Sequence, residues 1–323
     1  MKIKKYFDQA KLMLSVLPIV GQEKDFALKG GTALNFFHLN MPRLSVDIDL
    51  TFLPIQPRNE TLKNITNSLG RISDSIKRLF PRCQIQKLKM KNTDYVYKLI
   101  INSEGCLVKI EPNLILRGSC YPLVYKPLCI KACEIFKMEM EVPVLSFADL
   151  YGGKICAALD RQHPRDLFDI KLLSEMGSID KEICQAFVVY LASHNRPMSE
   201  LLSPNFHDFK QAYENEFKGM SSIDVSYQEL EKIGKTLPTL MLSKLSRNER
   251  KFLLSVKLGS PDFSLLSISG LENFPAIKWK IENILKMEPK KRITATEKLK
   301  SILNLSQQQN STDSTVDSGI ELY

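Results

Sequence analysis

The sequence predicts an α/β (α+β) fold, with an α/β first half and a mostly helical second half. Strand-like and helix-like segments alternate up to about residue 113, and from Ser146 onward apolar residues recur at helical spacing. The 323 residues exceed what one hydrophobic core usually holds. We therefore expect two domains, residues 1–145 and 146–305, followed by a polar, disordered tail over residues 306–323.

The first half is expected to contain short elements separated by Gly and Pro. Asn102-Ser103-Glu104-Gly105 separates YVYKLII from CLVKIEPNLIL and predicts a hairpin. Pro81 ends a helical pattern that begins near residue 60. The other elements expected here are a helix over residues 4–20, a strand over 26–29, a helix over 32–39 and a strand over 44–53. In the second half, helices are expected over 146–160, 165–176, 180–194, 206–217 and 227–235, with several more up to about 304.

Composition and charge limit the class of protein. The sequence contains no uninterrupted run of ~18 apolar residues, the length needed to span a membrane. The N-terminus lacks the features of a signal peptide. A cytoplasmic protein is therefore expected. Seven cysteines without a CxxC pair argue against a disulfide framework, and four scattered histidines argue against a zinc site. The net charge of +9 favours a polyanionic partner such as nucleic acid, although it also fits simple solubility.

The stretch ALKGGTAL, followed by PRLSVDIDLTFL, indicates a nucleotide site. Gly30 and Gly31 before a helix expose backbone N–H groups, and Thr32 adds a hydroxyl, a combination that suits phosphate. Side chains at i and i+2 of a strand share a face, so Asp47 and Asp49 form a pair that suits a magnesium ion. The nearest alternatives are an ordinary glycine turn and a solvated strand edge.

Further candidate residues follow in KIE and in SFADLYGGKICAALDRQHPRDLFDI. Glu111 could complete a carboxylate triad for metal, or lie on an exposed strand face. Lys154 lies inside a helix, and Arg165 and Asp166 lie in the first turn of the next. A Lys and an Arg near a triphosphate would neutralise charge on the leaving pyrophosphate. The alternative is a solvated lysine and an aspartate that favours a helix N-terminus.

Together, GGTAL, RLSVDIDL, KIE, the Lys154 helix and PRDLFDI resemble the AbiEii/AbiGii nucleotidyltransferase toxin family of type IV toxin–antitoxin systems, and are similar to the MenT toxins. The resemblance covers roughly residues 24–176. It implies a DNA polymerase β-like minimal nucleotidyltransferase domain, a helical domain and an active site between them. It implies catalytic roles for Asp47, Asp49, Lys154 and Asp166, and metal binding by Asp47, Asp49 and Glu111. Nucleotide binding is assigned to Lys29, Gly30, Gly31, Thr32, Arg43, Ser45 and Arg165.

The implied reaction is Mg²⁺-dependent transfer of a nucleoside monophosphate from a nucleoside triphosphate to a hydroxyl, with release of pyrophosphate. An RNA acceptor, above all the 3′ end of tRNA, is expected from the resemblance and the basic charge. Basic stretches at residues 76–91 and 288–292 could contact it. A cognate antitoxin that need not bind the toxin is also expected, for defence against phage by abortive infection. A protein or small-molecule acceptor such as an antibiotic, and a non-catalytic binding protein, remain as alternatives.

Overall fold

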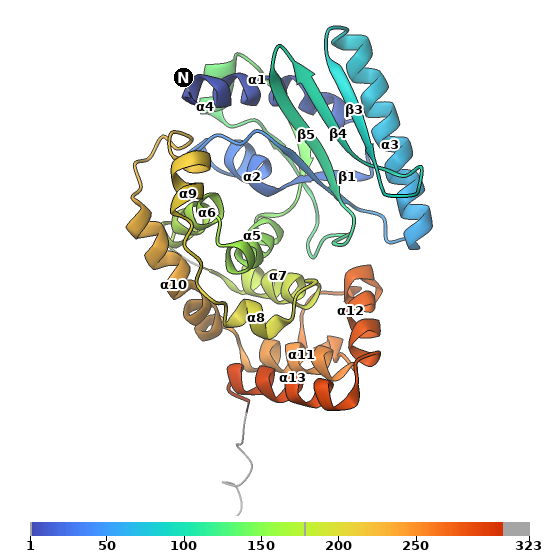
Figure 1. The fold of residues 1–323 in the computed structure, drawn as a ribbon, viewed down its shortest axis with the longest axis vertical. Helices are drawn as coiled ribbons and strands as arrows, with labels where there is room; N and C mark the ends of the chain where they lie inside the picture. Colours follow the sequence, from blue (N-terminus) through green and yellow to red (C-terminus); the bar gives the residue numbers. More distant parts are fainter. Residues whose placement is uncertain (1, 178, 306–323) are drawn as a thin grey trace, which may run out of the picture.

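The computed structural model describes residues 2–177 and 179–305 and confirms the predicted fold class (Figure 1). Seven strands form one mixed sheet in the order β3-β4-β5-β2-β1-β7-β6. The strands are β1 Phe26–Lys29, β2 Ile48–Phe52, β3 Gln84–Lys89, β4 Val96–Ser103, β5 Cys106–Asn113, β6 Val124–Pro127 and β7 Glu141–Val144. The predicted tail lies outside the described residues.

Helices cover both faces of the sheet (Figure 1). Helix α1 (Lys2–Val20) and helix α3 (Arg58–Leu79) pack on each other and against β5 and β4. On the other face, the short helix α2 (Gly30–Ala33) and the π-helical turn η1 (Leu34–His38) lie between the sheet and helix α5 (Phe147–Arg161). This second face is the one that meets the helical half.

The helical half follows β7. Its helices are α6 Pro164–Glu175, α7 Lys181–Ala192, α8 Met198–Leu202, α9 Lys210–Ala212, α10 Tyr227–Lys244, α11 Arg247–Leu258, α12 Pro275–Leu285 and α13 Pro289–Ile302, with a π-helical turn η2 at Tyr213–Phe217. None of the described helices is both long and apolar enough to cross a membrane.

Two hydrophobic clusters form the core. One is built from residues between Ala10 and Leu150, and the other from Leu34 and residues between Ala148 and Leu303. Helix α5 contributes to both. The boundary at residues 145 and 146 stays a prediction.

Three strands were not expected from the sequence. β3 is an edge strand whose Gln and Lys side chains are mostly exposed, so it has no buried face to produce an alternating pattern. β6 and β7 have four residues each and contain Pro127 and Pro143, which obscure strand signals. Part of the basic stretch 76–91 is therefore β3.

Several predicted boundaries were wrong. The strand expected over 44–53 begins only at Ile48, because Leu44 N–H donates to the Met220 carbonyl and Arg43 bridges to Ser221. The segment before β2 therefore pairs with a loop of the helical half. Of the helix expected over 206–217, only α9 and the turn η2 form, whereas α10 continues through Pro238 to Lys244.

Candidate functional site

Three strands bring Lys29, Asp49 and Glu111 into one row. In the antiparallel pair β1 and β2, Lys29 lies opposite Asp49, and in the parallel pair β2 and β5, Asp49 lies opposite Glu111. Paired residues point to the same face of a sheet. Their neighbours Leu28, Ile48 and Ile110 are buried in the core below. The row therefore lies on the face that meets the helical half.

Gly30 is required by the carboxylate beside it. Its backbone has φ +71°, and a Cβ there would lie 2.4 Å from Asp49 Oδ2. At Gly31, a Cβ would lie 2.8 Å from Arg43 Nη2 and 3.0 Å from Ser45 Oγ. The absence of a Cβ at the two glycines thus leaves space for the Asp49 and Arg43 side chains. Binding of phosphate by their N–H groups stays a prediction.

Thr32 and Ser45 hold the segment that carries the first aspartate. Both are buried, and Thr32 Oγ1 donates to the Asp47 carbonyl at 2.6 Å and lies 2.9 Å from Ser45 Oγ. The Thr32 hydroxyl therefore orients the backbone of the DxD pair. Nucleotide contact by Thr32 and Ser45 stays a prediction.

A largely buried network of charges, in which only the Arg161 side chain is exposed, faces the row from the helical half. Lys154 Nζ is 2.9 Å from an Asp166 oxygen and 3.0 Å from an Asp169 oxygen. Arg161 donates to Asp166 at 2.6 Å, and Arg43 donates to Asp169 through Nε at 2.8 Å and Nη2 at 2.6 Å. Asp166 and Asp169 are three residues apart on α6, so they share a helix face. Three cations and two carboxylates leave this network one positive charge in excess.

Burial and neighbouring charges shift the pKa values of these groups. Burial raises the pKa of Asp49; Lys29 opposes this, and Asp47 adds to it. Burial lowers the pKa of Lys29 against the attraction of Asp49. Burial alone would raise the pKa of Asp166, but Lys154 and Arg161 hold it well below its usual range. Asp166 is thus a fixed anion, whereas Asp49 sits where its negative charge is costly.

Two predicted residues have other partners. Glu111 is paired with Lys98, whose Nζ lies 2.7 Å from its carboxylate. Arg165 points toward Glu216 in η2, 3.8 Å away, and is not part of the buried network. Arg161, not Arg165, forms the ion pair with Asp166, and nucleotide binding by Arg165 stays a prediction.

Four residues of the site were missed by sequence reasoning: Arg161, Asp169, Lys98 and Asn35. Asp169 carried a signal, since it follows Asp166 at helical spacing. Lys98 did too, because a turn at Glu104 and Gly105 places it opposite Glu111 in the hairpin. Asn35 donates to the Gly31 carbonyl at 2.9 Å within the same helical segment, and it approaches Asp169, a contact that only the tertiary fold creates.

The carboxylates have the donor chemistry of a magnesium site. Asp47 and Glu111 both add to the negative potential at Asp49, and carboxylate oxygens are the ligands that Mg²⁺ prefers. Within residues 2–177 and 179–305, no group of three His, Cys, Asp or Glu side chains is gathered closely enough to hold a metal ion. The residues fit the ion chemically, and the Glu111 carboxylate is paired with Lys98.

The chain resembles known nucleotidyltransferase toxins in sequence and in fold. Residues 11–283 match the model of the family described as nucleotidyl transferase AbiEii toxin, type IV toxin–antitoxin system. No curated protein matches. Among solved structures, the chain is similar to MenT4, a nucleotidyltransferase toxin from Mycobacterium tuberculosis H37Rv, with a TM-score of 0.55 and 13% identity over 87% of this chain and 94% of that one.

Proposed function

Because the chain belongs to the AbiEii nucleotidyltransferase toxin family of type IV toxin–antitoxin systems, we propose that it transfers a nucleoside monophosphate from a nucleoside triphosphate to RNA in the cytoplasm. The acceptor is a hydroxyl at the 3′ end of tRNA, and pyrophosphate is released. The observation that carries this proposal is the row of Lys29, Asp49 and Glu111, which faces a buried network with excess positive charge.

Asp47, Asp49 and Glu111 are the proposed ligands of Mg²⁺. Bound there, the ion would lower the pKa of the attacking hydroxyl and neutralise charge on the phosphates. The raised pKa of Asp49 supports this role, because burial and then the charges of Asp47 and Glu111 make its negative charge costly, and a bound cation would relieve this cost. Glu111 joins the set by exchanging Lys98 for the ion.

The triphosphate is proposed to lie between Gly30 and Gly31 on one side and Lys154 on the other. Lys29 and the excess positive charge of the buried network attract it. Arg43, Thr32 and Ser45 act by holding the segment before β2 in place. Arg161 supplies the arginine contact in place of Arg165, because Arg161 already lies beside Asp166 and influences Asp49 electrostatically.

Asp166 is proposed to act through Lys154. Its carboxylate fixes the Lys154 amine at 2.9 Å and stays ionised, so the amine keeps its proton and its position. The family also implies an antitoxin, and we propose that it counteracts the enzyme without needing to bind it.

The test is incubation of purified protein with Mg²⁺, total tRNA and each α-labelled nucleoside triphosphate in turn. We expect label on RNA with the wild type and none with Asp49→Asn, while Asp94→Asn, an exposed aspartate in the β3–β4 turn, retains full activity. Omission of Mg²⁺ should also abolish labelling. Label on protein or on small molecules would show that the acceptor belongs to one of those classes and not to RNA. Absence of all label would indicate a non-catalytic binding protein.

A further inference from the structure

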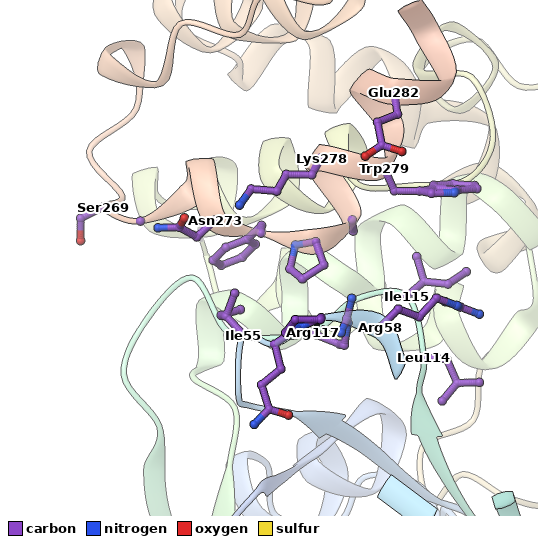
Figure 2. A pocket seen from close by; sticks show the side chains of 16 residues that line it. Ile55, Arg58, Leu114, Ile115, Arg117, Ser269, Asn273, Lys278, Trp279 and Glu282 are labelled. Carbon is purple, nitrogen blue, oxygen red and sulfur yellow. Dashed lines mark hydrogen bonds between the residues drawn. The ribbon is translucent and has the colours of Figure 1, made fainter. Parts of the chain in front are cut away.

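A second candidate site lies where the loops after β2 and β5 face the segment that contains α12. We name it the sheet-end cleft; it has a volume of about 1220 Å³ and is lined by residues 55–58, 114–115 and 117 on one side and by residues between Ser269 and Glu282 on the other. Figure 2 shows the two walls facing each other, with Trp279 above Ile115 and Arg58. None of the residues assigned to the nucleotide site lines it.

The sheet-end cleft carries positive charge that the protein does not neutralise. Arg58, Arg117 and Lys278 line it, against the single carboxylate of Glu282. Among the described residues, none of these three cations forms an ion pair. A cleft with three free cations and one carboxylate is complementary to an anion.

Arg117 gives a second indication of an anion. Its side chain is only 7% exposed, held by bonds from Nη1 to the Gln56 carbonyl and to Thr61 Oγ1, and its Nε is buried without a hydrogen-bond partner. Burial and the nearby charge of Arg58 both lower its pKa. A buried guanidinium held next to another cation is costly unless an anion binds.

The apolar lining suits a flat ring. Trp279 is 46% exposed on α12, and Ile55 and Ile115 on the opposite wall are 43% and 41% exposed. An exposed indole beside unpaired arginines matches the pattern of single-stranded nucleic-acid sites, in which bases stack on aromatic rings and cations follow the phosphates. Neither a duplex nor a simple phosphate would use the indole.

The sheet connects this cleft to the carboxylates. β2 and β5 are parallel, and both run from the carboxylate row toward the cleft. Leu114 lies only three residues beyond Glu111, which corresponds to roughly 10 Å along a strand. One nucleic-acid strand can therefore occupy the cleft while its end reaches the row.

We propose that the sheet-end cleft binds a single-stranded segment of the nucleic-acid acceptor, with phosphates on Arg58 and Arg117 and a base against Trp279. This inference rests on the proposed function, since it names the docking surface of the proposed acceptor. It differs from the basic stretches at residues 76–91 and 288–292, which do not line the cleft.

Trp279 is the only tryptophan of the chain, so its fluorescence reports on this cleft alone. The experiment titrates the full-length protein with a 12-nucleotide oligouridylate at several salt concentrations, in the absence of nucleoside triphosphate and Mg²⁺. We expect saturable quenching for the wild type and for Asp49→Asn. Arg58→Glu should weaken binding about tenfold and reduce the salt slope by about 0.7 for each phosphate that the variant no longer neutralises.

Arg247→Glu is the matched control. Arg58 and Arg247 are both exposed and are the first residues of α3 and α11. The two substitutions therefore change the net charge equally, and each places a negative charge at a helix N-terminus, where it is stabilising. Arg247→Glu should bind as the wild type does. Trp279→Ala, followed by anisotropy of a labelled oligonucleotide, should weaken binding about tenfold because the base has no ring to stack on.

Equal binding by Arg58→Glu and Arg247→Glu, or an unchanged Trp279 signal at saturation, would overturn the inference. Labelling of tRNA by the wild type in that case leaves the proposed function standing. Oligonucleotide binding with the expected pattern supports the cleft even if no nucleotide is transferred, so the two failures are distinguishable.

Discussion

Arg43 and Asp169, 126 residues apart in the sequence, form a buried bidentate ion pair with contacts of 2.8 and 2.6 Å. The pair joins the segment before β2 to α6, so it fixes the DxD strand against the helical half. Both side chains are almost fully excluded from solvent. Removal of one partner would leave an uncompensated charge in the interior.

Arg43→Met is therefore expected to lower the free energy of unfolding by about 3–5 kcal/mol. Lys154 also contacts Asp169 and offsets part of this destabilisation. The control is Lys89→Met, which breaks the exposed pair with Asp94 and should cost less than about 1 kcal/mol. Denaturant unfolding of the two variants measures the difference, and similar decreases would contradict a structural role for the Arg43 pair.

The free energy of unfolding should fall in acid because Asp166 and Asp169 become protonated. Burial alone would raise their pKa values, but Lys154 and Arg161 lower that of Asp166, and Arg43 and Lys154 lower that of Asp169. Because these pKa values are lower in the folded state, the stability they contribute is present above about pH 4 and lost as the pH falls through the folded values. Asp166→Asn should lower stability at pH 7 and flatten its decline in acid. Urea titrations at successive pH values test this, and an unchanged slope would refute it.

Asp49→Asn should have the opposite effect on stability while abolishing nucleotide transfer. The folded pKa of Asp49 is raised, so its contribution to stability is present below the unfolded pKa and lost as the pH rises through the folded value. At pH 7, above the unfolded pKa, Asp49 therefore destabilises the protein relative to a neutral side chain. The amide should raise the melting temperature at pH 7, give no gain below about pH 4, and remove stabilisation by Mg²⁺. A lower melting temperature for Asp49→Asn at pH 7 would mean that the carboxylate has a structural partner.

Gly30→Ala tests the contact with Asp49. The substitution adds a Cβ at φ +71°, which costs about 1–2 kcal/mol, and places it 2.4 Å from Asp49 Oδ2. Gly105→Ala is the control, since Gly105 has φ +80° with no atom within 4 Å of the added Cβ. We expect similar backbone costs but loss of activity only at Gly30. Unfolding and labelling assays on both variants separate strain from displacement of the carboxylate.

Gly152 and Gly153 should respond differently to alanine although they are adjacent in α5. A Cβ on Gly152 would lie 2.7 Å from Phe187 N in α7, whereas one on Gly153 would make an ordinary 3.7 Å contact with Tyr190. Gly152→Ala should lower the free energy of unfolding by about 1–3 kcal/mol through overpacking. Gly153→Ala should raise it by roughly 0.5–1 kcal/mol through helix propensity. Thermal unfolding measures both, and equal effects would show that α5 and α7 can separate freely.

The sequence predicted those parts of the fold that carry a strong local pattern. The β4–β5 hairpin, helix α3 and the helical second half follow from periodicity and from Gly and Pro positions. β6 and β7 could not be predicted, because four-residue strands containing proline depend on neighbours far away in sequence. The late start of β2 has the same origin, since Leu44 pairs with Met220.

The candidate site shows the same division. Strand alternation predicted that Asp47 and Asp49 share a face. The structure places Asp49 in β2 in register with Glu111, whereas Asp47 precedes the first residue of β2. The partners of the predicted residues could not be predicted from the sequence, because Lys154 contacts Asp169 only when α5 packs on α6. Arg165 illustrates the limit: helix position alone could not tell that Arg161, four residues earlier, faces Asp166.

The pairing of Arg43 with Asp169 also sets an order for biosynthesis. A chain translated only to residue 145 already contains Asp47, Asp49 and Glu111, but Lys154, Arg161 and both aspartates of α6 are still missing. In such a chain the Arg43 guanidinium cannot be buried, because its partner Asp169 is absent. The segment before β2 also lacks its hydrogen bond to the Met220 carbonyl. The site is therefore completed late in the synthesis of the chain, and truncated translation products should lack activity even when all three of these carboxylates are present.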